Sequence, residues 1–543
     1  MPLPLVLRNL GANVTGAGRR LAGSLALPRG RGFWVRLEIA AHLTELPGGV
    51  SLPGTPQPGP PLLTVLEALA SAARDPRVHG VFVRIAASPG GFATTETLRR
   101  SLRAVRDAGK PVVVYADRLG AEELLLASAA TRIVMPEAGS VFLVGLRAES
   151  FFWKGLLDRF GVRPDVVRVG DFKNAAESFT RTSMSESQRE QLEALLDDQF
   201  EGLVGGLAEA RGLAADDVRT LVDRGPYGAA AAREAGLIDD CLFPDQLEAL
   251  LAELSGLPAP GENEAGSVPS VDVGVYHLWR AGTTGWLPLL RERPRFAYVV
   301  AAGMIRYGSG TRGVGSDGYR RLLSRLQHDA RIRGVVLRVE SPGGDALASD
   351  LLWRSVQQLS AQKPVVVSMG EVAASGGYYI AAGADAIVAE AMTLTGSIGV
   401  VGGKVDLSGL FETAGVGHDA IERGERAGLL SPARGFSPDE RAVVRDEMRT
   451  MYERFLERVA EGRSLERERV RALASGRVWS GRRAQEHGLV DGLGGPLEAL
   501  AEVRKRAGLT PDEDCRVELH PRRPRLGSLL GTLQPGWWPG SGR

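Results

Sequence analysis

The sequence predicts an α/β protein in which one parallel-sheet domain is present twice. The motif Ser-Pro-Gly-Gly at residues 88–91 recurs at residues 341–344, and the motif Lys-Pro-Val-Val-Val at residues 110–114 recurs at residues 363–367. Both pairs are 253 residues apart. Within each copy, short apolar and β-branched runs alternate with helical patterns, which is typical of parallel β-α-β units. A repeat of this size indicates two homologous domains, with functional groups expected at the carboxyl ends of the strands.

The elements of the two copies are expected in the same order. Strands are predicted at residues 32–37 and 296–300, 80–85 and 334–339, 112–115 and 365–368, and 133–134 and 387–388. The second strand of each copy leads into the Ser-Pro-Gly-Gly turn and then a helix. Charged, periodic segments at residues 185–224 and 437–475 predict surface helices, and each copy closes with a similar motif at residues 236–239 and 488–491.

The chain is expected to divide into five segments. They are a leader at residues 1–30, a first repeat at 31–253, a linker and connecting segment at 254–292, a second repeat at 293–506, and a tail rich in Pro, Gly and Arg at 507–543. Residues 254–271 are rich in Pro, Gly and Ser, which argues against a helix there. The tail is expected to be loosely ordered.

The composition is that of a globular protein with no electrostatic preference for nucleic acid. Hydrophobic residues make up 44% of the 543 residues, charged residues 24%, and the net charge is +1. A nearly neutral chain lacks the basic surface that nucleic-acid binding needs. Cys241 and Cys515 are far apart and have no metal-ligand or redox spacing, so neither a disulfide framework nor a zinc site is indicated. We expect no cofactor and no metal.

The beginning of the chain does not match a membrane-spanning or secretory segment. No stretch reaches the roughly 18 to 20 uninterrupted apolar residues that span a bilayer, and the leader lacks the ordered regions of a signal peptide. Residues 3–26 could form a weakly amphipathic basic segment that lies on a membrane. A disordered leader is the alternative that we favour.

The two copies differ at two positions that could carry chemistry. Ser375 of the second copy lies opposite Glu122 of the first, at the same offset of 253 residues. Lys173 of the first copy lies opposite Ala427 of the second, at an offset of 254. A nucleophile in one repeat and an amine in the other suggest a catalytic pair assembled across the domain boundary.

Ser375 lies in a setting that suits a nucleophile. A serine hydroxyl needs a base to accept its proton, and attack on a carbonyl needs donors for the developing oxyanion. The glycines after Ser375 can begin a helix whose free N–H groups favour negative charge. The turn at residues 341–344 can supply a second N–H, most plausibly from Gly344. The competing explanation is that both glycine sites only make tight turns.

Lys173 is the best candidate for the base. None of the seven histidines follows Ser375 in a motif-like setting, and the nearest is His418. Burial can lower the pKa of a lysine by several units, so that the amine becomes a base. The chain has only six lysines, and Lys173 follows a strand-like run at residues 166–169. A solvated side chain is the ordinary explanation for a single lysine, and Lys404 is the reserve candidate.

Four motifs together resemble the long form of signal peptide peptidase A. They lie at residues 170–177, 339–344, 373–378 and 394–399, in the order of that family, and the resemblance runs from about residue 31 to residue 506. It implies two tandem domains with the fold of crotonase and the caseinolytic protease. It also implies a homotetramer that cleaves membrane-derived peptides, such as signal-peptide remnants, and a membrane-associated location.

The resemblance assigns roles to individual residues. It implies that Ser375 is the nucleophile, Lys173 the general base and Ser397 the hydroxyl that positions the lysine. It implies oxyanion donors at Gly376 and at the turn containing Gly343 and Gly344. These roles describe a serine endopeptidase that acts on apolar peptides through an acyl-enzyme.

Two features of this sequence differ from the usual pattern of that family. Long-form relatives usually begin with a membrane-spanning anchor, and none is visible here. Glu340 stands where the family commonly has asparagine, and we expect this change to alter a local turn contact without touching a catalytic role.

Two alternatives to a peptidase remain open at the level of the sequence. A crotonase-type enzyme acting on acyl-CoA would use similar glycine-rich oxyanion sites, but it would leave Ser375 and Lys173 without a role. A catalytically silent scaffold is plausible for the first repeat alone, where Glu122 replaces the nucleophile.

Overall fold

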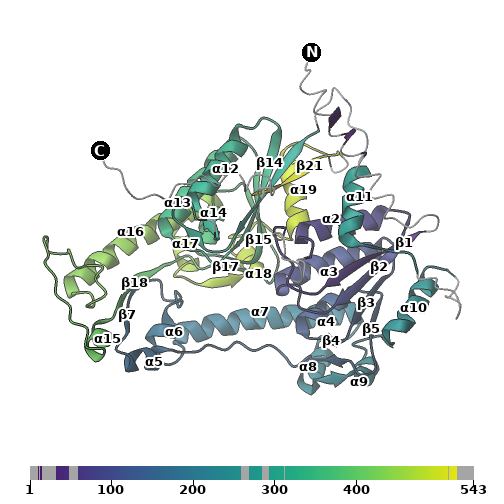
Figure 1. The fold of residues 1–543 in the computed structure, drawn as a ribbon, viewed down its shortest axis with the longest axis horizontal. Helices are drawn as coiled ribbons and strands as arrows, with labels where there is room; N and C mark the ends of the chain where they lie inside the picture. Colours follow the sequence, from purple (N-terminus) through teal and green to yellow (C-terminus); the bar gives the residue numbers. More distant parts are fainter. Residues whose placement is uncertain are drawn as a thin grey trace, which may run out of the picture.

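The structure, a computed structural model, describes residues 10–11, 13–14, 17, 32–47, 59–257, 268–283, 293–310, 312–510 and 513–521. Within these ranges the chain forms two large sheets, one in each repeat (Figure 1). The two sheets and their helices follow the order predicted from the sequence. An additional pair of strands joins the two repeats.

The first repeat is built on a six-stranded sheet in which all neighbouring strands are parallel. In spatial order its strands are β10 (Ser270–Asp272), β1 (Phe33–Ile39), β2 (Val78–Ile85), β3 (Val112–Ala116), β5 (Arg132–Met135) and β9 (Asp240–Cys241). The short strands β4 (Arg118–Leu119), β6 (Ser140–Val141) and β8 (Tyr227–Gly228) form a small separate sheet. The helices are α2 (Leu62–Arg74), α3 (Phe92–Asp107), α4 (Ala121–Ala127), α5 (Lys154–Arg159), α6 (Glu177–Thr180), α7 (Glu186–Arg211), α8 (Ala215–Arg224), α9 (Ala229–Glu234), α10 (Leu247–Leu254) and α11 (Val273–Thr283), with a 3₁₀ turn at Pro244–Gln246.

The second repeat has an eight-stranded sheet with the same central order. Its strands are β19 (Val478–Ser480), β17 (Leu394–Gly396), β15 (Val365–Ala374), β14 (Ile332–Ser341), β11 (Arg295–Ala302) and β21 (Arg516–His520), with β16 (Ala386–Ala389) beside β15 and β20 (Gly492–Leu493) beside β16. A two-stranded ladder joins β12 (Ile305–Arg306) and β13 (Val314–Gly315). The helices are α12 (Ser316–His328), α13 (Ala346–Ser360), α14 (Gly376–Ala381), α15 (Ser408–Thr413), α16 (Pro438–Arg463), α17 (Arg467–Leu473), α18 (Gly481–Glu486) and α19 (Pro496–Arg506).

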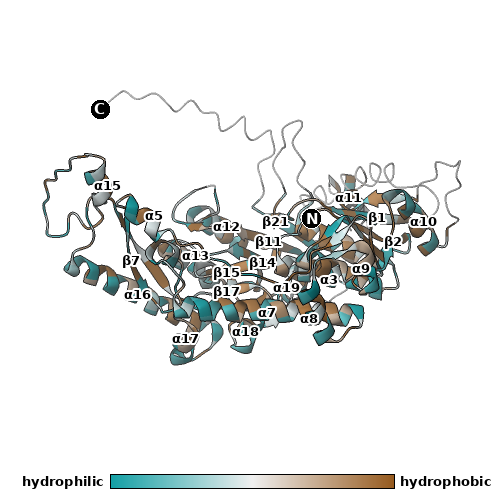
Figure 2. Cartoon of the chain, turned by 90° about the horizontal axis from the view of Figure 1, so that it is seen from below, coloured by the Kyte–Doolittle hydropathy of each residue, from teal (hydrophilic) through white to brown (hydrophobic). Residues whose placement is uncertain are grey.

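Both sheets are covered by helices on their two faces. The run Val-Val-Val-Tyr-Ala of β3 is buried at every position, as expected for a strand covered on both sides. One face of the first sheet packs against α2, α3 and α4, and the other packs against α10. In the second repeat, α19 packs on the face of the sheet that corresponds to the face covered by α10 in the first repeat. The central strands β14 and β15 are therefore mainly hydrophobic, whereas α16 is largely hydrophilic (Figure 2).

An arm of the first repeat reaches across the second repeat. Its strand β7 (Arg163–Val169) pairs antiparallel with β18 (Val400–Asp406), which belongs to the second repeat. The helix α7 then runs beneath the second repeat back to the first (Figure 1). The residues directly after β7 are consequently held beside the second sheet rather than beside their own.

Carboxylates of the second repeat bind the α3 helix of the first. The Glu371 carboxylate accepts the N–H groups of Ala93 and Thr94 at 3.1 and 2.5 Å, at the start of α3. A negative charge at this end is stabilised by the free N–H groups and the helix dipole. Further along α3, Glu390 accepts hydrogen bonds from Thr97 and Arg100. This contact fixes the first repeat against β15, the strand that ends at the candidate nucleophile.

Two of the predicted segment boundaries were wrong. The segment 254–292 contains β10, which is the edge strand of the first sheet, and α11, which packs on α2. The segment 507–543 contains β21, which pairs with β11 at the edge of the second sheet. In both cases a short strand of modest apolar content is stabilised by a parallel partner distant in the sequence, and local composition does not reveal such a partner.

The leader prediction falls mostly outside the described residues, which include only residues 10–11, 13–14 and 17 of that segment. Among the helices that the structure describes, none is long and apolar enough to cross a membrane.

Candidate active site

Ser375 lies at the junction between β15 and α14. Its backbone has a φ of +54°, a conformation that is uncommon for a residue with a side chain and that often marks functional sites. The Ser375 N–H donates to the carbonyl of Gly396 at 2.8 Å, which fixes this turn against β17. The hydroxyl therefore projects from a rigid strand end, where the sequence predicts a nucleophile.

Lys173 reaches Ser375 from the arm of the first repeat. Its Nζ atom lies 3.0 Å from Ser375 Oγ, 2.9 Å from Ser397 Oγ and 2.8 Å from the Ser397 carbonyl oxygen. All three contacts lie within one chain. The structure thus brings together the three residues that the sequence predicts as nucleophile, base and lysine-positioning group.

The environment of Lys173 favours its neutral form. The residue is only 6% exposed, and burial lowers the pKa of its amine to about 8. Among the described residues no carboxylate forms an ion pair with it. An opposite charge would favour the ammonium form, so its absence leaves desolvation as the dominant effect.

A turn of the second repeat at residues 475–477 fixes the lysine loop. The Ser475 carbonyl accepts the Phe172 N–H at 2.8 Å, and the Arg477 carbonyl accepts the Ser397 N–H at 2.7 Å. The same turn therefore holds the backbones on both sides of the Lys173 amine. The sequence motifs did not predict this turn, because it acts through backbone carbonyls.

Gly476 makes the closest approach in this turn. Its φ is +81°, and a Cβ atom there would lie 2.6 Å from the Lys173 nitrogen and 2.7 Å from the Lys173 Cα. Only a residue without a side chain allows this contact. Next to it, the Arg477 guanidinium lies 4.7 Å from the ring centroids of both Phe172 and Trp479. The guanidinium therefore packs the lysine loop against the second repeat.

A second missed network lies behind the lysine loop. Glu177 is buried and accepts hydrogen bonds from Arg168 Nη1, Asn174 Nδ2 and Ser185 Oγ at 2.7, 2.8 and 2.9 Å. These bonds lower the pKa of the Glu177 carboxyl and outweigh the opposing effect of burial. A fully bonded buried carboxylate fixes the chain around it. Glu177 lies in the motif that carries the family resemblance, and this was the only signal for it.

Of the predicted oxyanion donors, one already has an acceptor within its own turn. The N–H of Gly343 donates to Ser341 Oγ at 3.1 Å and is therefore already used within the turn. In the described chain no acceptor is bonded to the N–H groups of Gly344 and Gly376. A Cβ on Gly343 would lie 2.8 Å from Ser375 Cβ and 2.7 Å from the Gly376 nitrogen, so the turn and Ser375 are in direct contact.

The other candidates lie away from Ser375. Lys404 Nζ donates to the Leu429 carbonyl at 2.9 Å and lies over the Phe436 ring, so it is not the base at this site. His418 is exposed in the segment after α15. Within the described ranges, we find no group of three or more His, Cys, Asp or Glu residues that could hold a metal ion.

The position in the first repeat that is equivalent to Ser375 has a glutamate instead of a serine. Glu122 accepts a hydrogen bond from Ser88 Oγ at 2.7 Å, and Ser88 belongs to the turn equivalent to residues 341–344. Ala427, opposite Lys173 in the predicted register, is exposed in a turn. The first repeat lacks the serine and the second lacks the lysine. The described chain therefore contains one such serine–lysine pair, with one residue from each repeat.

A family comparison identifies the class of protein. The model of peptidase family S49 matches residues 104–258 and 357–510, one stretch in each repeat and together more than half of the chain. The chain belongs to peptidase family S49. It is a serine endopeptidase of the signal peptide peptidase A type, and this membership decides against the acyl-CoA enzyme and against a silent scaffold for the chain as a whole.

Relatives match this S49 peptidase over most of its length. The Arabidopsis thaliana protein "Serine protease SPPA, chloroplastic" is 33% identical over 513 residues, which cover 92% of this chain and 74% of the relative. "Protease 4" of Haemophilus influenzae is 32% identical over 473 residues, which cover 84% of this chain and 75% of the relative. Among solved structures, a membrane-bound stomatin-specific protease covers 43% of this chain with a TM-score of 0.29 and 14% identity. That structural likeness is too slight to classify the fold.

In this S49 peptidase, the Glu340 side chain contacts the strand that leads to Ser375 rather than its own turn. Its carboxylate accepts the N–H groups of Glu371 and Val372 at 2.7 and 3.3 Å, in the part of β15 just before Ser375. The expectation of an altered turn contact was therefore wrong, because the side chain crosses to the neighbouring strand. Burial raises the pKa of Glu340 to about 7, while Arg338 lowers it and Glu371 and Glu45 raise it further.

We expect Glu340→Gln to change how stability depends on pH. In the folded wild type, burial raises the pKa of the Glu340 carboxyl from 4.5 to about 7. The protonated carboxyl therefore stabilises the folded state, and this stabilisation is complete below about pH 4.5. That stabilisation is lost as the pH rises from 4.5 to about 7. Glutamine does not titrate, so the Tm of the variant relative to wild type should rise across the window. Parallel Tm curves for the two proteins would show that Glu340 does not titrate there.

Proposed function

We propose that this peptidase works through a Ser/Lys dyad, with Ser375 as nucleophile and Lys173 as general base. The observation that carries the proposal is the 3.0 Å distance between Lys173 Nζ and Ser375 Oγ, at a lysine whose pKa burial lowers to about 8. A neutral amine has two N–H groups and one lone pair. The oxygens of Ser397 supply acceptors for the two N–H groups, so the lone pair is left for the Ser375 hydroxyl.

The proposed reaction has two halves. Ser375 Oγ attacks the peptide carbonyl as its proton passes to Lys173 Nζ, and the N–H groups of Gly344 and Gly376 stabilise the oxyanion. When the C–N bond breaks, the Lys173 ammonium returns the proton to the leaving amine, and an acyl-enzyme remains. Lys173 then takes a proton from water, the hydroxide attacks the ester carbonyl, and the proton passes to Ser375 Oγ as the product acid leaves.

We also propose that the substrates are extended apolar peptides, such as cleaved signal peptides. Apolar side chains border the oxyanion turn: the Ile305 N–H donates to the Gly343 carbonyl at 2.9 Å, and the neighbouring Met304 is 52% exposed. Leu347, in the first turn of α13, is 54% exposed. Exposed apolar groups beside a nucleophile favour apolar substrate side chains.

The family resemblance also supports a detailed fold, an assembly and a location for this protein. We propose that each repeat has the fold of crotonase and the caseinolytic protease, and that the first repeat serves mainly to supply the lysine. We further propose a homotetramer with peripheral membrane contact. Light scattering of the purified protein and sedimentation with lipid vesicles would test the last two statements.

Labelling of Ser375 by a fluorophosphonate tests the dyad directly. The reagent requires an activated serine, so its rate should rise with pH and reach half of its maximum near pH 8, where Lys173 loses its proton. Mass spectrometry should find the label on Ser375, and Ser375→Ala should remove both the label and the cleavage of an apolar fluorogenic peptide. Labelling that is independent of pH around this midpoint would contradict Lys173 as the base.

A further inference from the structure

The two repeats share a structural pair at the end of the helix that follows their first strand. In the first repeat the Arg77 N–H donates to Asp75 Oδ1 at 3.1 Å, and in the second the Arg331 N–H donates to Asp329 Oδ1 at 3.0 Å. Each guanidinium also forms an ion pair with its aspartate, at 2.7 and 2.6 Å. The two pairs are 254 residues apart and mark equivalent points at the ends of α2 and α12.

In the first repeat the helix α11 covers this pair. The Tyr276 hydroxyl lies 3.2 Å from Asp75 Oδ2, and the Arg77 guanidinium lies 4.1 Å from the centroid of the Trp279 ring. Tyr276 is fully buried and Trp279 is 7% exposed. The groove between α2 and the edge strands β1 and β10 is therefore filled by the chain that continues from β10.

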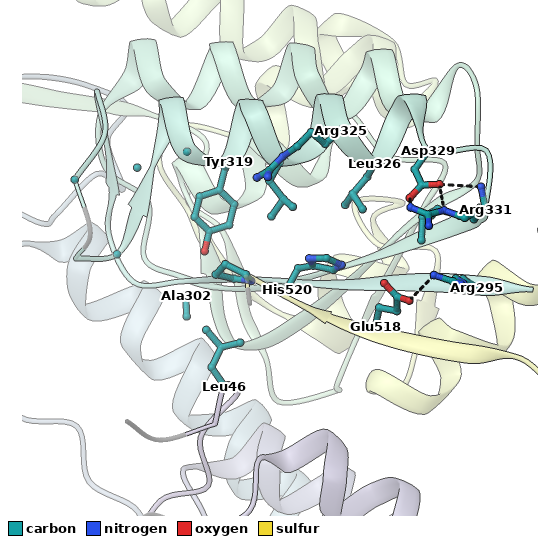
Figure 3. A pocket seen from close by; sticks show the side chains of 17 residues that line it. Leu46, Arg295, Ala302, Tyr319, Arg325, Leu326, Asp329, Arg331, Glu518 and His520 are labelled. Carbon is teal, nitrogen blue, oxygen red and sulfur yellow. Dashed lines mark hydrogen bonds and ion pairs between the residues drawn. The ribbon is translucent and has the colours of Figure 1, made fainter. Parts of the chain in front are cut away.

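In the second repeat a cavity of about 890 Å³ lies at the equivalent place. Tyr319, Leu326 and Arg325 of α12 line one wall, and Glu518 and His520 of β21 line the opposite wall (Figure 3). Apolar residues such as Leu322, Leu326 and Ile332 line the cavity together with the charged Arg325, Asp329 and Glu518. We call this cavity the α12 groove.

The strand register shows where the chain enters each groove. Trp34 of β1 pairs with Gly80 and Ser270, and Phe296 of β11 pairs with Gly334 and Val517. Ser270 and Val517 are consequently equivalent, and the same register makes Pro521 equivalent to Gly274 in the first turn of α11. Pro521 itself lines the α12 groove. The chain leaves β21 at the point where, in the first repeat, it begins to fill the groove.

We infer that the α12 groove is the docking site for residues 522–543 of the same chain, which would cover it as α11 covers the first repeat. These residues lie outside the described part of the chain, and their sequence suits the role. Leu526, Leu529, Leu530 and Leu533 have the spacing of one face of a helix, and Pro535 follows them. Attachment at Pro521 gives the segment a high local concentration at the groove.

The leucine stripe of the occupant carries no charge, whereas Arg522, Arg523 and Arg525 precede it. The α12 wall presents Arg325, where α2 presents Ser71. Residues 526–534 have no charged side chain, so the stripe itself places no like charge against Arg325. Trp537 and Trp538 offer ring faces of the kind that Arg77 contacts on Trp279. The inference does not depend on the peptidase chemistry.

Photo-crosslinking in the full-length protein tests this docking. With p-benzoylphenylalanine in place of Arg325, irradiation should give an intramolecular crosslink, and mass spectrometry should place it within residues 522–543. The matched control carries the same photoreactive residue in place of Ser71, the equivalent position on α2, where α11 should be captured. Capture of another chain, capture of a different segment, or no crosslink at position 325 while the Ser71 control succeeds would overturn the inference.

A double variant in the tail tests whether the leucine stripe is the part that binds the groove. Leu529→Lys with Leu530→Lys places two charges on the apolar stripe, so the yield at position 325 should fall more than about tenfold. The yield at position 71 should not change, which shows that the protein remains folded. An unchanged yield at position 325 would mean that the leucine stripe does not bind the groove.

Discussion

Replacing Lys173 by methionine should reduce kcat/KM for an apolar peptide by at least about 10⁴-fold, because the nucleophile then has no base. Methionine has a similar length and fills the same buried space without an amine. The free energy of unfolding should not fall, since the substitution removes a polar group that is only 6% exposed. Steady-state cleavage of a fluorogenic peptide and the rate of fluorophosphonate labelling measure the effect.

Lys154→Met is the matched control for this variant. Lys154 lies on α5 of the same arm, and its ammonium pairs with Asp158 on the surface. Its loss should leave peptide cleavage close to wild type. Activity in Lys173→Met comparable to that of Lys154→Met would refute the dyad, whereas inactivity of both variants would point to damage to the arm.

Gly476→Ala should lower kcat by about 100-fold or more, although Gly476 touches no substrate. The added Cβ would lie within 2.7 Å of three backbone and side-chain atoms of Lys173, so the lysine loop must move away. A displacement of about 1 Å in a catalytic group can cost this much in rate. KM should change little, because the substrate-binding side of the turn at residues 341–344 is not affected. Initial rates over a range of peptide concentrations separate the two parameters.

Gly415→Ala controls for backbone strain. Gly415 also has a positive φ, +69°, but a Cβ atom there would meet nothing within 4 Å. Both variants therefore place a side chain in the left-handed region of φ and strain the backbone, but only Gly476→Ala displaces the lysine. Equal losses of activity in the two variants would show that strain, rather than the contact with Lys173, is responsible.

The sequence was sufficient to predict which two residues meet at the candidate site, because the repeat acts as an internal reference. Ser375 and Lys173 stand out where one copy keeps a reactive group and the other has Glu122 or Ala427. The order of strands and helices in both repeats is also visible from local patterns, since a strand covered on both faces is apolar along its whole length.

The supporting structure could not be predicted in this way. The turn at residues 475–477 acts through backbone carbonyls and through the lack of a Cβ atom on Gly476, and neither property has a residue-type signature. The arm that pairs β7 with β18 depends on contacts between residues more than two hundred positions apart. The edge strands β10 and β21 are short and need parallel partners from elsewhere in the chain.

The pairing of β7 with β18 has a consequence during synthesis of the chain. Translation produces Lys173 first and Ser375 202 residues later, and β18 follows still later. A ribosome-bound chain that has folded its first repeat holds an amine without a hydroxyl to activate. The contact between Lys173 and Ser375 can therefore form only after β18 has been synthesised and has paired with β7.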